Sequence, residues 1–138
     1  MEGMGLVAEN FEVPAEFHHD LLTIGPLRYR PAGAILIAEG QRSSAAFFIT
    51  DGNVRMSRPK TSSLNAFALT LGPGSLLCLL AVMSRAGSPV TLEALVASHI
   101  TLVTASRVRD LMTMRPGFCF EVAKILSHEA HAFHEIPA

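Results

Sequence analysis

Between residues 27 and 103 the chain consists of short apolar or alternating runs, each closed by turn-forming residues, and this texture leaves few folds open. The runs are five to seven residues long, which is the length of a strand and too short for an ordinary helix. They cover residues 34–38, 46–50, 53–57, 66–71, 90–96 and 100–104. The pattern predicts many brief strands joined by tight turns.

The clearest turn signal lies at Asp51 and Gly52, between the apolar runs 47–49 and 54–56. Glycine adopts positive φ values without strain, and tight turns between antiparallel strands require such values. Three more glycines, Gly33, Gly40 and Gly74, stand where a β-roll has to reverse direction. The sequence therefore predicts a hairpin at 51–52 and mainly structural roles for these glycines.

Helical spacing appears on both sides of this β-rich region. Pro14 opens an amphipathic stretch that Gly25-Pro26 ends, Ser106 is expected to cap a short helix, and Pro116 is expected to begin a longer one. We expect residues 1–13 to form a loose arm and residues 14–138 to form one domain that includes the helix from about 116. The order predicts a mainly β fold, a closed or sandwiched β-roll flanked by helices.

Length and charge narrow the classes of partner. A chain of 138 residues with 49% hydrophobic and 17% charged residues holds one buried core and is too short for two ordinary domains. A net charge of -1 provides no basic surface for nucleic acid, and no apolar stretch reaches the length of a membrane span. The chain also begins without a secretion signal, so we expect a cytoplasmic protein with no membrane or direct nucleic-acid partner.

Four segments, in this order and spacing, resemble the cyclic-nucleotide-binding domain of catabolite-activator-type (CRP-FNR-like) regulators, protein kinase A regulatory subunits and nucleotide-gated channels. The resemblance covers about residues 22–133. The segments are the Pro-x-Gly turn and first strand at 30–36, the hairpin at 47–54, the Gly-Pro-Gly turn at 71–75, and the last strand with its following helix at 97–112. The resemblance implies a β-roll of the jelly-roll, or double-stranded β-helix, type.

The phosphate-binding cassette is where this sequence departs from the family. In ligand-binding members a Gly-Glu pair opens a short helix, the Glu binds the ribose, and a later Arg pairs with the cyclic phosphate; a helix N-terminus with a guanidinium suits an anion. Counted from Gly74, the Gly-Glu positions fall on Cys78 and Leu79. Counted back from residue 94, the Arg position falls on Ser88. The resemblance therefore implies a degenerate nucleotide site.

Several interpretations of the cassette remain open. The candidate ligand-binding positions are Gly74, Cys78, Leu79, Arg85, Ser88, Pro89 and Thr91. Arg85 lies in the same loop and provides an alternative cation for cyclic AMP or cyclic GMP. The apolar residues of the cassette form either a filled core or the lining of an apolar or planar ligand site, such as one for haem or a fatty acid. Cys78 is a redox-sensitive thiol if it heads a helix, because helix N-termini lower thiol pKa values; otherwise both cysteines are buried and reduced.

The last helix carries two further candidates. An apolar stripe, wider than one roll needs, predicts a homodimer through this helix, with folding back on the roll as the alternative. The stripe consists of Phe118, Val122, Ile125, Leu126 and Phe133. His128, His131 and Glu135 fall on one helical face and form a weak candidate metal site, although a solvated helix face is the simpler interpretation.

No catalytic constellation appears: no nucleophile elbow, phosphate loop or framed carboxylate pair. We therefore expect a non-enzymatic regulatory or sensory module with a degenerate nucleotide site and an unknown small ligand or protein partner. No DNA-binding segment follows the long helix in this sequence, so DNA binding is not expected of it. The alternatives are genuine cyclic-nucleotide binding through atypical contacts, a structural dimerisation module, and a haem or metal sensor.

Overall fold

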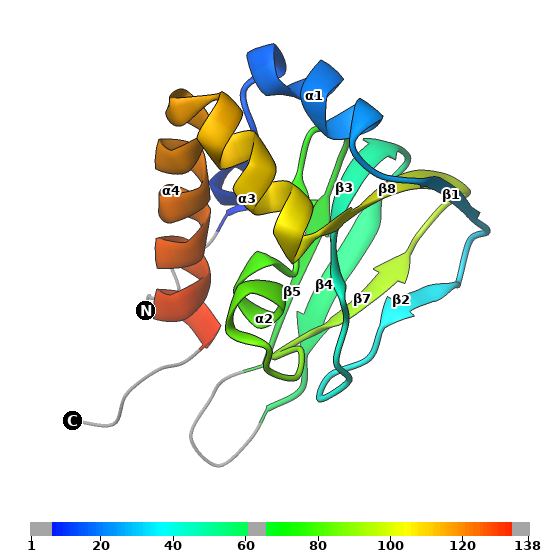
Figure 1. The fold of residues 1–138 in the computed structure, drawn as a ribbon. Helices are drawn as coiled ribbons and strands as arrows, with labels where there is room; N and C mark the ends of the chain where they lie inside the picture. The colour runs from blue at the N-terminus through cyan, green and yellow to red at the C-terminus, as the bar shows by residue number, and fades with distance from the viewer. Residues whose placement is uncertain (1–6, 61–65, 134–138) are drawn as a thin grey trace.

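Two antiparallel sheets of four strands each, flanked by helices, make up the computed structural model, which describes residues 7–60 and 66–133 (Figure 1). One sheet has the strand order β1-β8-β3-β6 and the other β2-β7-β4-β5. The strands are β1 (Leu27–Arg30), β2 (Ile35–Ile37), β3 (Ala45–Asp51), β4 (Val54–Arg58), β5 (Phe67–Leu71), β6 (Leu76–Leu77), β7 (Thr91–Ala94) and β8 (Ser98–Thr104). The predicted mainly β roll with flanking helices is confirmed.

Hydrophobic patterning explains which strands are central. Ala45 to Ile49 of β3 are buried without interruption, as expected of a strand covered on both faces, and β3 pairs with β8 and β6 on its two edges. In β4 the buried Val54 and Met56 alternate with the exposed Arg55, so one face of that strand lies on the core. The sheets therefore enclose a single apolar interior.

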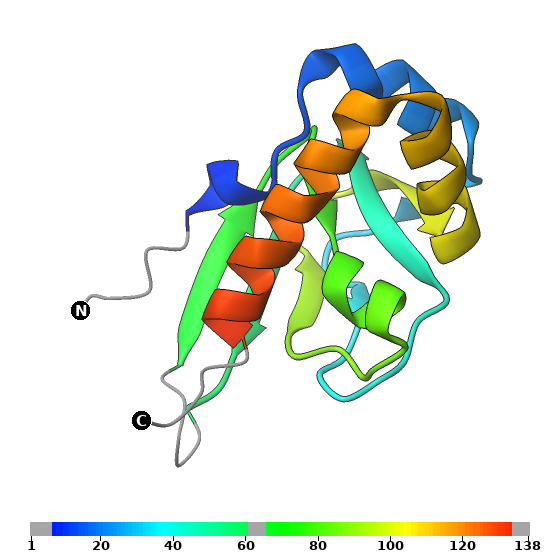
Figure 2. The ribbon, with the colours of Figure 1, turned by 60° about the vertical axis from the view of Figure 1, so that its left-hand side comes forward.

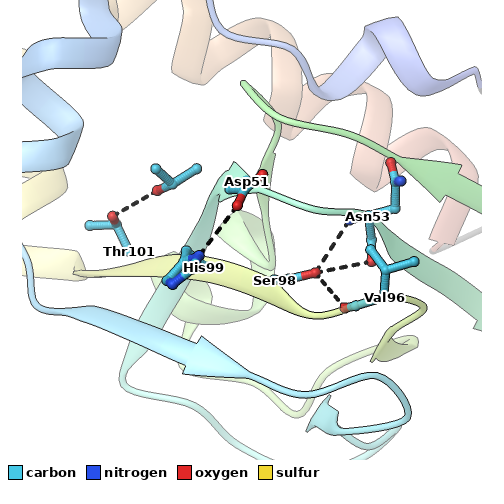
Figure 3. A network of polar contacts seen from close by, with 7 residues as sticks. Asp51, Asn53, Val96, Ser98, His99 and Thr101 are labelled. Carbon is cyan, nitrogen blue, oxygen red and sulfur yellow. Dashed lines mark hydrogen bonds and ion pairs between the residues drawn. The ribbon is translucent and has the colours of Figure 1, made fainter.

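The hairpin predicted at Asp51-Gly52 joins β3 to β4, and it is held by a neighbouring strand (Figure 3). The Ser98 hydroxyl donates a hydrogen bond to the Val96 carbonyl at 2.8 Å and accepts one from the Asn53 N–H at 3.3 Å. Gly52 has φ +102°, and a Cβ atom at this position would collide with Ser98. Both backbone conformation and close packing therefore require glycine at position 52.

The helices surround one side of the roll. They are η1 (Ala8–Phe11), η2 (Ala15–Phe17), α1 (His18–Thr23), α2 (Leu79–Ser84), α3 (Ala105–Met114) and α4 (Pro116–Phe133). The cap of α3 is Thr104, not the predicted Ser106, because Thr104 is still extended and its hydroxyl accepts the Arg107 N–H at 3.4 Å. No described helix has the length and apolar character needed to cross a membrane.

Residues 7–13, which the sequence assigns to a loose arm, pack against the body. Phe11 is fully buried and its ring stacks on Phe133 with 6.5 Å between centroids. The Val13 N–H donates to the Gly74 carbonyl at 2.9 Å, and Glu12 forms an isolated bridge with Ser75. The expected boundary at residue 13 therefore does not separate an arm from the core here, whereas residues 1–6 lie outside the described residues.

The long helix α4 lies beside the roll, next to β5 and α2 (Figure 2). Its Phe133 ring stacks on Phe67 of β5 with 5.8 Å between ring centres. Its Phe118 ring contacts Phe17 of η2 with 5.4 Å between ring centres. The two aromatic contacts lie near opposite ends of α4 and fix its course across the surface. This course brings the C-terminal half of α4 next to α2, the helix of the cassette.

Candidate functional site

The short helix α2 begins and ends at residues with a left-handed backbone. Cys78, which precedes it, has φ 68° and ψ 23°, and Arg85, which follows it, has φ 58° and ψ 36°. This conformation favours glycine, and other L-residues are strained in it by about 1–2 kcal/mol. The resemblance places the family's glycine at position 78. Cys78 therefore keeps the backbone conformation that glycine would supply and adds a buried side chain.

The position expected to carry the ribose-binding carboxylate is part of the core. Leu79 is fully buried. The neighbouring cassette side chains that are also buried are Leu76, Leu77, Val82 and Val90, whereas Leu80 and Met83 are partly buried. These contacts support the filled-core interpretation of the cassette.

The position expected to carry the phosphate-binding cation holds a buried hydroxyl. Ser88 is 2% exposed, and its hydroxyl donates to the Val90 carbonyl at 2.6 Å. Thr91 is likewise used within the chain, because its hydroxyl accepts the Glu39 N–H at 3.0 Å. Pro89 has no N–H to offer. The polar groups at these positions are thus committed to the loop itself.

Gly74 and Arg85 take no part in these hydrogen bonds of the cassette. The N–H and carbonyl of Gly74 bond to Ile49 and Val13, so Gly74 shapes the turn before the cassette. Arg85 is exposed at the C-terminal end of α2 and lines a hollow of about 410 Å³ together with Arg42. Six residues of helix separate the two ends by about 9 Å along the axis. Arg85 therefore stands at the opposite end of α2 from the positions where the resemblance implies phosphate contacts.

A residue that the sequence analysis did not select, Glu129 of α4, contacts the cassette directly. Its Oε1 accepts a hydrogen bond from the Leu80 N–H at 3.0 Å, and the residue is 2% exposed. Burial raises the pKa of Glu129 to about 8, partly offset by the hydrogen bond from Leu80. A signal was present in the sequence: Glu129 follows Val122 by seven residues and Ile125 by four, which places it within the apolar stripe.

Cys78 heads α2 as the redox hypothesis required, but its chemistry is the reverse of what that hypothesis needs. Burial, together with the nearby Glu129 carboxyl, raises the pKa of Cys78 to about 12, and a hydrogen bond with the Ser88 side chain lowers it only in part. Reactive cysteines are those with depressed pKa values. The prediction of a redox-sensitive thiol at Cys78 is therefore wrong, and the structure supports the simpler interpretation of a buried, reduced cysteine.

The apolar stripe of α4 is used within the monomer. Phe118, Val122, Ile125 and Phe133 are each at most 3% exposed, and Leu126 is partly buried. The stripe is wide because it covers α2, α3, η1 and β5 at once. The predicted use of these side chains as a dimer interface is therefore not met, and the alternative, folding back on the roll, describes them.

The candidate metal residues do not form a cluster among the described residues. His128 lies with its Nε2 3.5 Å from the Asn10 side-chain amide, and His131 is exposed. Glu135, the third member, lies outside the described residues. Within residues 7–60 and 66–133, no group of three His, Cys, Asp or Glu side chains is placed to hold a metal ion.

Comparison with known proteins bears on the fold. The family model of the cyclic nucleotide-binding domain matches residues 27–115. The structure resembles the catabolite activator protein of Thermus thermophilus with a TM-score of 0.70 and 19% identity, covering 83% of this chain and 54% of that one. No curated protein sequence matches the chain significantly.

Two further solved structures show the same fold with a TM-score of 0.70. A transcriptional regulator from Thermotoga maritima is 15% identical, with 85% of this chain and 92% of that chain covered. A protein of a cyclic-GMP-dependent signalling pathway that regulates bacterial phytopathogenesis is 20% identical, with 83% of this chain and 90% of that chain covered. The chain thus spans about half of the Thermus protein and nearly all of these two domains.

Proposed function

Because the chain belongs to the cyclic nucleotide-binding domain family, we propose that it is a non-enzymatic regulatory or sensory module in which the family's nucleotide site has become degenerate. One observation carries the proposal. The chain itself fills the cassette and bonds its polar groups. Leu79 is fully buried, the Ser88 hydroxyl donates to the Val90 carbonyl, and the Glu129 carboxyl accepts the Leu80 N–H.

The energetics of phosphate binding support this proposal. A hydrogen bond to a charged group contributes about 1.5–3 kcal/mol, and Ser88 offers no such charge. The Leu80 amide of the cassette already donates to Glu129, whose pKa burial raises to about 8, so this carboxyl group competes with a phosphate by holding the amide and not by charge. A cyclic nucleotide therefore loses its counter-charge and meets an amide that is already bonded and a filled space.

Titration calorimetry with cyclic AMP and cyclic GMP tests the proposal directly. We expect no saturable heat up to roughly millimolar ligand, which corresponds to a binding free energy weaker than about −4 kcal/mol. Saturable binding at micromolar concentration, unaffected by a surface change such as Arg28→Ala, would show that the cassette is functional after all.

The remaining exposed face of α4 supports a homodimer as a second feature of the module. Phe120 is 68% exposed on this helix, and Ala123, Ser127 and Ala130 are exposed at three- and four-residue steps from it. A second copy of α4 would cover this face without disturbing the buried stripe. Light scattering of the wild type and of Phe120→Asp tests this: we expect a dimer that the substitution converts to a monomer, and a wild-type monomer contradicts it.

We place the module in the cytoplasm, in keeping with its two free cysteines, Cys78 and Cys119. Its output is proposed to pass to a small ligand or protein partner. The resemblance to a catabolite activator and a transcriptional regulator supports a role in transcription control. A haem or metal sensor gains no support from the described residues, which hold no group of three ligands.

A further inference from the structure

The carboxyl group of Glu129 lies at the one end of α2 where amides face outward from the helix. The first four N–H groups of any helix lack an intrahelical partner, and Leu80 is the second residue of α2. Its N–H finds an acceptor on another element, the Glu129 Oε1 at 3.0 Å. An acidic group from elsewhere in the chain thus takes a position that suits an anion.

We propose that Glu129 is the cassette's own occupant: its carboxyl group takes the amide at the start of α2 and thereby excludes anionic ligands from this site. The inference rests on the proposed function and deepens it, because it names the residue that sets the ligand class. A ligand accepted here has to bind without the Leu80 amide, which is the group that a phosphate would use, and so must not carry a phosphate at this point.

The surroundings of Glu129 favour exclusion over recruitment of an anion. No described basic side chain forms an ion pair with it. The buried cation of this region, Arg58, donates to the Ala132 carbonyl at 3.4 Å and lies 4.9 Å from the centre of the Phe67 ring. The Cys78 thiol also lies within electrostatic reach of the carboxyl group, and it carries no positive charge. An incoming anion would therefore find the Leu80 amide already bonded to Glu129, and no described cation paired with that carboxyl group.

Packing holds the carboxyl group in place. Glu129 lies between two buried residues of α4, Ile125 one turn before it and Phe133 one turn after it. The amide it binds belongs to a helix whose neighbouring side chains, Leu79 and Val82, are also buried. Both sides of the contact are thus anchored in the core, which favours the carboxyl group staying on the amide.

Amide hydrogen exchange on the intact chain tests the contact. In Glu129→Ala we expect exchange at the Leu80 amide to become at least about tenfold faster, because its acceptor is lost, whereas Glu129→Gln retains an acceptor and most of the protection. Glu121→Ala is the matched control, since Glu121 lies two turns earlier on the same helix, is 9% exposed and pairs with Lys124 at 3.2 Å. Exchange at Leu80 that is unchanged in Glu129→Ala, or equally fast in Glu121→Ala, overturns the inference.

A second measurement tests exclusion itself. Leu79→Glu with Ser88→Arg restores the two side chains that the resemblance implies for cyclic AMP, and this double variant is compared with the triple variant that also carries Glu129→Ala. We expect the triple variant to bind cyclic AMP at least about tenfold more tightly. Equal affinity in the two variants, or binding in neither while circular dichroism shows both to be folded, overturns exclusion. The proposed function fails separately, if the unmodified chain binds cyclic nucleotide at micromolar concentration.

Discussion

Two turns of this molecule share a left-handed backbone and differ in what they place there. At the β3–β4 hairpin the residue is Gly52, with φ +102° and the Ser98 side chain packed where a Cβ would be. At the start of α2 the residue is Cys78, with φ 68° and a buried side chain. The comparison shows that the roll fixes the course of the backbone at both points. Only the hairpin also fixes the residue, because it alone leaves no space for a side chain.

The largest expected effect comes from breaking the hairpin side of this comparison. Gly52→Val is expected to lower the free energy of unfolding by about 4 kcal/mol, combining left-handed strain with overpacking against Ser98. Gly33→Ala is the control, since Gly33 has φ +89° but nothing within 4 Å of a Cβ, and should cost about 1–2 kcal/mol. Urea unfolding measures both, and equal losses would show that Ser98 does not restrict position 52.

A smaller effect tests the cassette side through Glu129. Its pKa is raised to about 8 from an ordinary 4.5, so between these values the folded chain holds a proton that the unfolded chain releases. The free energy of unfolding should therefore fall as pH rises from about 4.5 through about 8, by about 5 kcal/mol in all, and then level off. Glu129→Gln removes this contribution.

Urea unfolding at pH 5, 7 and 9 measures the difference between the wild type and Glu129→Gln, which isolates Glu129 from other titrating groups. We expect the amide variant to be close to the wild type at pH 5 and more stable at pH 9. Glu121→Gln serves as the control. A wild type that is as stable as Glu129→Gln at pH 9 contradicts the raised pKa.

The smallest effect sharpens the comparison at the two ends of α2. Arg85→Gly relieves left-handed strain at an exposed residue and should raise the free energy of unfolding by about 1 kcal/mol. Cys78→Gly relieves similar strain but removes a side chain that is 3% exposed, so its net effect should be smaller or negative. Thermal melts of both variants test the order, and a larger gain for Cys78→Gly would mean that the thiol contributes no packing.

The fold was largely accessible from the sequence because its signals are local. The turn at Asp51-Gly52, the short runs of β3 and β4, and Pro116 at the start of α4 each depend on neighbours within a few residues. The cap of α3 moved from Ser106 to Thr104 because both residues can cap, and the extended backbone of β8 decides between them.

The candidate site was only partly accessible, because its contacts are long-range. The absent Glu and Arg at positions 79 and 88 can be seen in the sequence, but the substitute at Glu129 is some fifty residues from α2 and hidden in an apolar stripe. Periodicity shows that the stripe is buried and does not show against what. For the same reason the sequence predicted that Phe118 and Phe133 contact a second subunit, whereas their rings contact Phe17 and Phe67 of the same chain.

The guanidinium of Arg58 has a mechanical consequence. It reaches from the sheet strand β4 to the Ala132 carbonyl in the final turn of α4, and its central carbon lies 4.9 Å from the centre of the Phe67 ring on the adjoining strand. Strand β4 and the last turn of α4 are thereby connected through one side chain. A pull on the last turn of α4 would load β4, a strand paired on both edges, before it loosened the helix alone.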